Sequence, residues 1–150
     1  MQDYESLDRR VRACVYDIAL QRGYPPKMAE TAEILNIPVE NVYGAFERLA
    51  SGRVLVLQPE SGEILMANPF SAVPTPFVVE TGLYSCYGNC IWDALGVVAM
   101  LQTDARIHTS CADCGSAAEL SIVSGKVSGD LGVIHFAIPA RLWWQDIVFT

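Results

Sequence analysis

Cysteine is the residue type in this sequence with the most evident chemistry, and four of the five cysteines lie close together. Cys86 and Cys90 are separated by three residues and Cys111 and Cys114 by two, so that the four fall within 29 residues. Four thiolates suit tetrahedral zinc, and thiolates also select soft ions such as Cu(I) and Hg(II). One interpretation is therefore a metal site made of these four thiols.

Cys90 permits a second chemistry, because it lies at the start of a predicted helix, 89–101. Free backbone N–H groups and the dipole at a helix N-terminus are expected to lower the pKa of its thiol. Asp93, three residues further on, faces the same side of that helix. A thiolate beside a carboxyl group forms a pair of nucleophile and proton donor. The alternative is structural, with Cys90 as a small buried side chain and Asp93 as a first-turn capping residue.

Three helices and a hairpin are predicted in the first part of the chain, residues 1–67, in the order of a winged helix-turn-helix. Apolar residues recur there at steps of three and four, which is typical of amphipathic helices. The predicted elements are helices at 4–22, 28–35 and 39–49 and hairpin strands at 54–57 and 63–66. A DNA-reading third helix is basic, whereas this one carries Arg48 as its only basic residue beside Glu40 and Glu47. Nucleic-acid binding is therefore not expected.

A proline-rich connecting segment, 68–77, separates this lobe from the second half of the chain. Its three prolines exclude both a helix and a central strand. Residues 78–150 are predicted to form a compact mixed or antiparallel sheet with one main helix, and the fold class is α+β. The predicted strands are 78–84, 107–109, 118–124, 133–138 and 147–150.

The composition narrows the class of protein further. Apolar residues make up 51% of the chain and charged residues 18%, which excludes a disordered protein. No apolar run approaches the roughly 20 residues of a membrane span, and the polar start of the chain does not resemble a signal peptide. The net charge of −7 divides into −2 for residues 1–60 and −5 for residues 61–150, so neither half attracts nucleic acid by its overall field. A cytoplasmic protein is expected.

Four stretches resemble the organomercurial lyases, also called alkylmercury lyases. The resemblance rests on the order and spacing of these stretches together. The winged-helix order predicted for residues 1–67 is also similar to the family. The stretches are Asn68–Phe77, the helix start Asn89–Leu95 with its Cys-x-x-Asp pattern, Ser110–Gly115, and a C-terminal signature in His135–Ala140 and Trp143–Thr150.

The resemblance implies protonolysis of a carbon–mercury bond, a detoxification reaction that releases a hydrocarbon and retains Hg(II). Cys90 would carry the mercury and Asp93 would relay the proton. No bound cofactor is required, the substrate is a small organomercurial, and cellular thiols remove the Hg(II) product. The second catalytic cysteine of the family is expected at or just beyond Thr150, and no cysteine follows Cys114. Cys86 or Cys114 is a candidate substitute.

Two other functions remain open from the residues. One is a non-catalytic protein that binds zinc, Cu(I) or Hg(II) through the four clustered thiols. The other is a metal-responsive winged-helix regulator, which the acidic third helix argues against. Asp93 discriminates among them, because a lyase needs its carboxyl group whereas a four-thiolate site does not.

Overall fold

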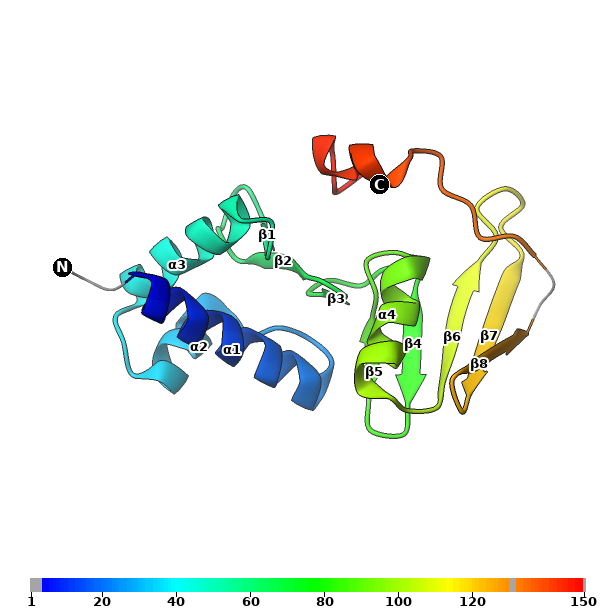
Figure 1. The fold of residues 1–150 in the computed structure, drawn as a ribbon, viewed down its shortest axis with the longest axis horizontal. Helices are drawn as coiled ribbons and strands as arrows, with labels where there is room; N and C mark the ends of the chain where they lie inside the picture. Colours follow the sequence, from blue (N-terminus) through cyan, green and yellow to red (C-terminus); the bar gives the residue numbers. More distant parts are fainter. Residues whose placement is uncertain (1–3, 130–131, 150) are drawn as a thin grey trace.

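The computed structural model describes residues 4–129 and 132–149 (Figure 1). The chain begins with three helices, α1 (Tyr4–Arg22), α2 (Met28–Leu35) and α3 (Val39–Ser51), followed by three short strands, β1 (Val56–Leu57), β2 (Ile64–Ala67) and β3 (Phe70–Ser71). The strands form an antiparallel sheet in the order β1-β2-β3. The three predicted helices and the hairpin are present, and β3 is an additional strand inside the predicted connecting segment.

The second half contains a five-stranded sheet and one long helix. Its elements are β4 (Val78–Thr81), β5 (Ser85–Tyr87), α4 (Ile91–Leu101), β6 (Ala105–Ser110), β7 (Ala117–Val123), β8 (Lys126–Gly129) and the 3-10 helix η1 (Ala140–Gln145). The strand order is β5-β4-β6-β7-β8, and all neighbouring pairs are antiparallel. The α+β class is confirmed, and the sheet is antiparallel rather than mixed.

Two clusters of buried side chains stabilise the fold, and α1 contributes to both. Val15 of α1 packs with Phe46 of α3 in the first cluster, whereas Ala19 of α1 belongs to the second, which surrounds α4. The Tyr84 hydroxyl donates a hydrogen bond of 3.0 Å to the Leu20 carbonyl. Because burial of apolar surface is the main favourable term in folding, α1 joins the two halves through both packing and hydrogen bonding.

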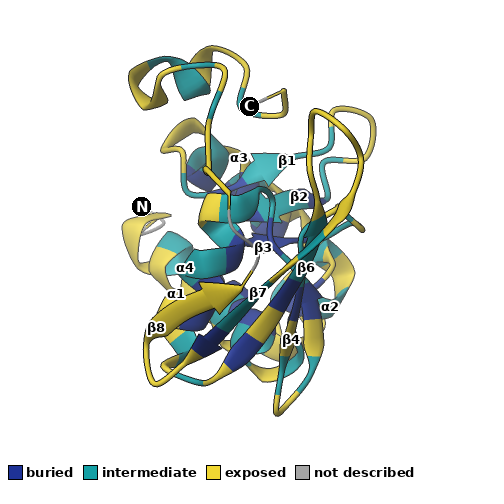
Figure 2. Ribbon diagram, turned by 90° about the vertical axis from the view of Figure 1, so that its right-hand side faces the viewer, coloured by how far each residue is buried: buried dark blue, intermediate teal, exposed yellow. Residues whose placement is uncertain are grey.

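α4 covers the middle of the five-stranded sheet and leaves β8 uncovered. Ala94 and Val97 of α4 are completely buried, as are Val79 of β4 and Ile107 of β6. Figure 2 shows β8 and the segment before the C-terminus mostly exposed. None of the helices in residues 4–129 and 132–149 is long and apolar enough to cross a membrane. The packing of α4 fixes the position of its first turn relative to the sheet.

Three of the predicted strands were wrong in extent or kind. The strand predicted at 78–84 ends at Thr81, because the chain turns at Gly82 and returns as β5. Residues 133–138 form no strand, and Val133 is 91% exposed. Residues 147–149 form turns rather than a strand, and Thr150 lies outside the described residues.

The C-terminal segment adopts a local structure instead of joining the sheet. β-branched and aromatic residues favour a strand only where a pleated, half-buried surface receives them, and within residues 132–149 no strand forms. The Trp143 indole N–H donates a hydrogen bond of 2.8 Å to the Ile138 carbonyl, and the Phe136 and Trp143 rings lie 5.0 Å apart. These contacts order part of the segment, whereas Val133, Val148 and Phe149 stay exposed.

Candidate active site

Cys90 is the N-cap residue of α4, directly before the first helical turn. Its backbone is extended, with φ −147° and ψ −177°, and its carbonyl oxygen accepts a hydrogen bond of 2.9 Å from the Ala94 N–H. The Cys90 side chain makes no capping hydrogen bond, but the backbone N–H groups of Trp92 and Asp93 lie near enough to lower the pKa of its thiol. The sulfur therefore lies beside the first turn of the helix, which carries Asp93.

The thiol of Cys90 is not the low-pKa thiol that the helix start predicted. Burial raises its pKa, and although the Asp93 and Trp92 N–H groups lower it, the charge of Asp93 raises it again. The helix N-terminus has the expected effect, but desolvation of the half-buried sulfur is larger. At neutral pH Cys90 therefore keeps its proton until a ligand displaces it.

Asp93 lies in the first turn of α4 and is half-buried. Burial raises the pKa of its carboxyl group, and a hydrogen bond from Asn89 opposes that rise. A carboxyl group whose pKa is raised is a better proton acceptor and shuttle near neutral pH than an exposed aspartate. The first turn thus holds a protonated thiol and a carboxyl group suited to exchanging its proton.

Asn89 links Asp93 to the chain that precedes the second half of the fold. Its side-chain amide donates to Asp93 Oδ2 at 2.9 Å, to Asn68 Oδ1 at 3.0 Å and to the Pro69 carbonyl at 3.4 Å. Asn89 Oδ1 is buried and has no hydrogen-bond partner among the described residues. A buried acceptor of this kind is costly and is often kept for function.

Tyr16 of α1 completes the site from the first half of the chain. Its hydroxyl donates to the Asn68 carbonyl at 3.1 Å and lies 3.5 Å from the Val54 carbonyl. Sequence reasoning missed Tyr16, Asn68 and Asn89, although Asn89 adjoins Cys90 and Asn68 begins the stretch that resembles the lyases. Asn68 and Asn89 are 21 positions apart in the sequence, and Tyr16 and Asn68 are 52 positions apart. No periodicity connects residues at such separations, so these contacts follow only from the tertiary fold.

Gly88 allows the first turn of α4 to approach the strand before it. A Cβ at this position would lie 2.6 Å from the Ala94 nitrogen, and the Gly88 carbonyl accepts a hydrogen bond of 2.6 Å from Thr75. We expect Gly88→Ala to lower the free energy of unfolding by about 1–3 kcal/mol, the usual cost of overpacking. Urea denaturation measures this change, and the same variant should displace the turn that carries Cys90 and Asp93.

Gly82→Ala is the matched control for that substitution. A Cβ at Gly82 meets no atom within 4 Å, so the free energy of unfolding should change by less than about 0.5 kcal/mol. Equal destabilisation by the two variants would contradict the close approach at Gly88.

Asn89→Ala should alter both stability and the ionisation of Asp93. Three acceptors lose their donor, so we expect a loss of about 1–3 kcal/mol in the free energy of unfolding. The pKa of Asp93 should rise further, because the hydrogen bond that lowers it is removed. A carboxyl ¹³C NMR titration measures that pKa, with Asn41→Ala on α3 as control. An unchanged pKa would show that Asn89 does not act on Asp93.

The remaining cysteines are not gathered around Cys90. Cys86 is buried in the core around α4, and burial raises its pKa to about 11, which suits a packing role. Cys111 and Cys114 are exposed on the loop between β6 and β7, where Ser116 lowers the pKa of Cys114. Within the described residues no group of three or more Cys, His, Asp or Glu side chains could hold a metal ion. The four-thiolate arrangement is therefore not formed.

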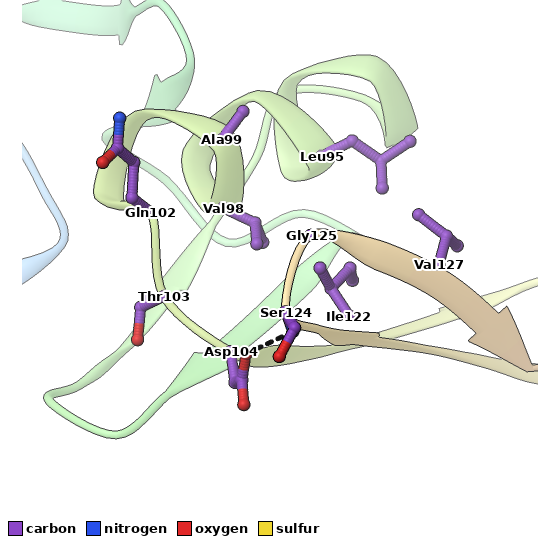
Figure 3. A pocket seen from close by; sticks show the side chains of 10 residues that line it. All are labelled: Leu95, Val98, Ala99, Gln102, Thr103, Asp104, Ile122, Ser124, Gly125 and Val127. Carbon is purple, nitrogen blue, oxygen red and sulfur yellow. Dashed lines mark hydrogen bonds between the residues drawn. The ribbon is translucent and has the colours of Figure 1, made fainter.

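Two cavities lie near the helices that carry the site. One, of about 510 Å³, is lined mainly by α1 and includes Tyr16 and Asn68, so it reaches the hydrogen-bond network of Asp93. The other, of about 490 Å³, lies between the C-terminal half of α4 and the β7–β8 hairpin (Figure 3). Neither Cys90 nor Asp93 lines either cavity.

Comparison with known proteins adds a family and a fold. A family model described as alkylmercury lyase matches residues 70–150. A solved structure titled as the mercury-bound form of MerB2 has a TM-score of 0.62 and 21% sequence identity, over 83% of this chain. The chain spans 63% of the length of that structure, and at this identity the likeness concerns the fold. No curated protein matches the sequence.

Proposed function

The chain belongs to the alkylmercury lyase family, and we propose that it cleaves carbon–mercury bonds by protonolysis, with Cys90 binding mercury and Asp93 transferring the proton. The observation that carries this proposal is the shared first turn of α4. There Asp93 follows the N-cap Cys90 by three residues, its N–H group and its charge both act on the pKa of the Cys90 thiol, and burial raises the pKa of the Asp93 carboxyl group. The pair has the donor and the acid that the reaction requires.

The first step is exchange of thiols on mercury. The Cys90 sulfur attacks a substrate of the form R–Hg–SR′, a sulfur–mercury bond forms, and the thiolate R′S⁻ leaves. Mercury is soft and prefers thiolate over the oxygen and nitrogen donors nearby. The Cys90 proton, which its raised pKa retains until then, passes to the ionised Asp93 carboxylate. Asp93 is thereby protonated, and the second step consumes this proton.

The second step is transfer of that proton to carbon. The electron pair of the carbon–mercury bond becomes the new C–H bond, the hydrocarbon leaves, and Hg(II) stays on the Cys90 sulfur. A small thiolate from solution occupies the second position on Hg(II), and a further exchange releases the ion as a dithiolate complex. Asn89, which donates to Asp93 Oδ2 at 2.9 Å, leaves Oδ1 as the oxygen that carries the proton.

The surroundings expected for this reaction follow from its co-reactants. Small thiols are needed both to deliver the organomercurial and to remove Hg(II), and they are abundant in the reduced cytoplasm. We therefore place the protein there and expect it to act on small organomercurials without a bound cofactor.

Release of free arene from an arylmercury compound tests this function. Purified protein is incubated with phenylmercury and an excess of a small monothiol, and benzene is measured by gas chromatography. We expect benzene in excess of the protein concentration, well above the amount formed with heat-denatured protein. Mercury retained without benzene would identify a binding protein of the same family and contradict the proposed catalysis.

A further inference from the structure

The loop between β6 and β7 presents two thiols side by side. The Cys111 N–H donates to the Ser116 carbonyl at 2.8 Å, and the Gly115 N–H donates to the Cys111 carbonyl at 2.9 Å. Gly115 has a φ of +72°, which closes this tight turn. The Cys114 sulfur lies 3.1 Å from the Ser116 hydroxyl, and the pKa of its thiol is lowered first by Ser116 and then by Cys111. Both cysteines are exposed.

The register of the sheet places this loop at the same end as Cys90. Val78 pairs with Tyr87 on one side and with His108 on the other. Because β5 and β6 both run antiparallel to β4, they leave this row in the same direction, β5 toward Cys90 and β6 toward Cys111. Figure 1 shows the start of α4 and the β6–β7 loop at the same end of the second half. No third side chain joins the two thiols, since the described residues contain no metal-binding group of three.

We propose that Cys111 and Cys114 form a second, surface site that chelates Hg(II) or a chemically similar soft cation between two sulfurs. Soft d¹⁰ ions accept two thiolates, whereas zinc in a structural site takes four ligands. The proposed two-thiol site therefore differs in ligand number and in preferred metal from the four-thiolate zinc site that the sequence permitted. Binding here does not depend on the proposed chemistry at Cys90.

The chemistry of binding is a ligand exchange without electron transfer. Each S–H bond releases its proton to solvent, and each sulfur donates one electron pair to the ion, so one Hg(II) releases two protons. The hydrogen-bonded turn carries both cysteines on one short loop, which makes the second sulfur–metal bond intramolecular. A monothiol in solution lacks that advantage, and the pair should retain the ion against it.

Hg(II) binding by the Cys90→Ser variant tests the site without the proposed active-site thiol. The protein is mixed with Hg(II) chloride and an excess of a monothiol, desalted, and analysed for mercury and for free thiols. We expect about one retained equivalent of Hg(II) and protection of two thiols. Adding either Cys111→Ser or Cys114→Ser should lower retained mercury at least tenfold, because each removes the chelate. Zn(II) offered in the same way should not be retained.

Cys14→Ala in the same Cys90→Ser background is the matched control, because it removes a buried cysteine of α1. It should leave retained mercury unchanged, and thermal unfolding checks that every variant is folded. Equal retention by the Cys111 and Cys114 variants and their parent would overturn the proposal, as would a site that loses mercury only with Cys14→Ala. Benzene release by the unmodified protein reports the lyase function separately.

Discussion

Cys90→Ser should reduce benzene release from phenylmercury by at least about a hundredfold, the scale on which loss of an essential nucleophile or general acid is felt. A serine hydroxyl is a hard donor with a much higher pKa than a thiol, so it neither binds mercury nor weakens the carbon–mercury bond. Asp93 and the Asn89 hydrogen bonds remain in place in this variant. The loss would therefore report on the sulfur atom alone.

Stability should change little in the same variant. Cys90 is half-buried and belongs to neither core cluster, and serine is a favoured N-cap residue. Cys111→Ser provides the matched substitution at an exposed cysteine and should keep its benzene release. If Cys90→Ser stayed active while folded, another thiol would have to carry the mercury, and the assignment of the site would fail.

Much of the site was readable in the sequence because it is local. The helical spacing from Ile91 onward predicted α4, and the three-residue step from Cys90 predicted that Asp93 shares its face. The N–H group and the charge of Asp93 both act on the pKa of the Cys90 thiol, which agrees with that prediction. The helices of the first half were equally readable, since α2 runs over the predicted residues, Met28–Leu35. Short-range periodicity is enough for features of this kind.

The rest depended on contacts that periodicity does not encode. The sequence suggested a thiolate at Cys90, yet burial by neighbouring chain raises its pKa. Asn68 meets Asn89 because β3 and α4 pack together, which no spacing rule foresees. Residues 133–138 are rich in the β-branched and aromatic residues that favour strands, but a strand also needs a neighbour to pair with. These are tertiary effects, and they decide both the electrostatics of the site and which residues, such as Asn68 and Asn89, take part in it.

Asp93→Asn should lower the turnover number for benzene release by about 10²–10⁴-fold, the usual contribution of a general acid. Asparagine has nearly the same shape, and its carbonyl oxygen can still accept the hydrogen bond from Asn89. It cannot take up the Cys90 proton and deliver it to carbon. Because Cys90 is untouched, formation of the phenylmercury–protein adduct should persist, and intact-protein mass spectrometry detects that adduct in a Cys111→Ser, Cys114→Ser background that removes the exposed thiols. Loss of the adduct together with turnover would assign Asp93 a binding role instead.

Asp93→Asn should lower activity but raise the stability of the folded protein, and the gain in stability should grow with pH. The folded pKa of Asp93 is raised by burial above its unfolded value of about 3.9. Below the unfolded pKa the group is protonated in both states and imposes no penalty. As pH rises through the window between the two pKa values, ionisation of the half-buried carboxyl group destabilises the folded protein. Asp93→Asn should therefore gain stability relative to the unmodified protein as pH rises from about 3.5 to 7, measured by urea denaturation at each pH. A constant difference across that range would contradict the raised pKa and, with it, the capacity of Asp93 to hold the proton between the two steps.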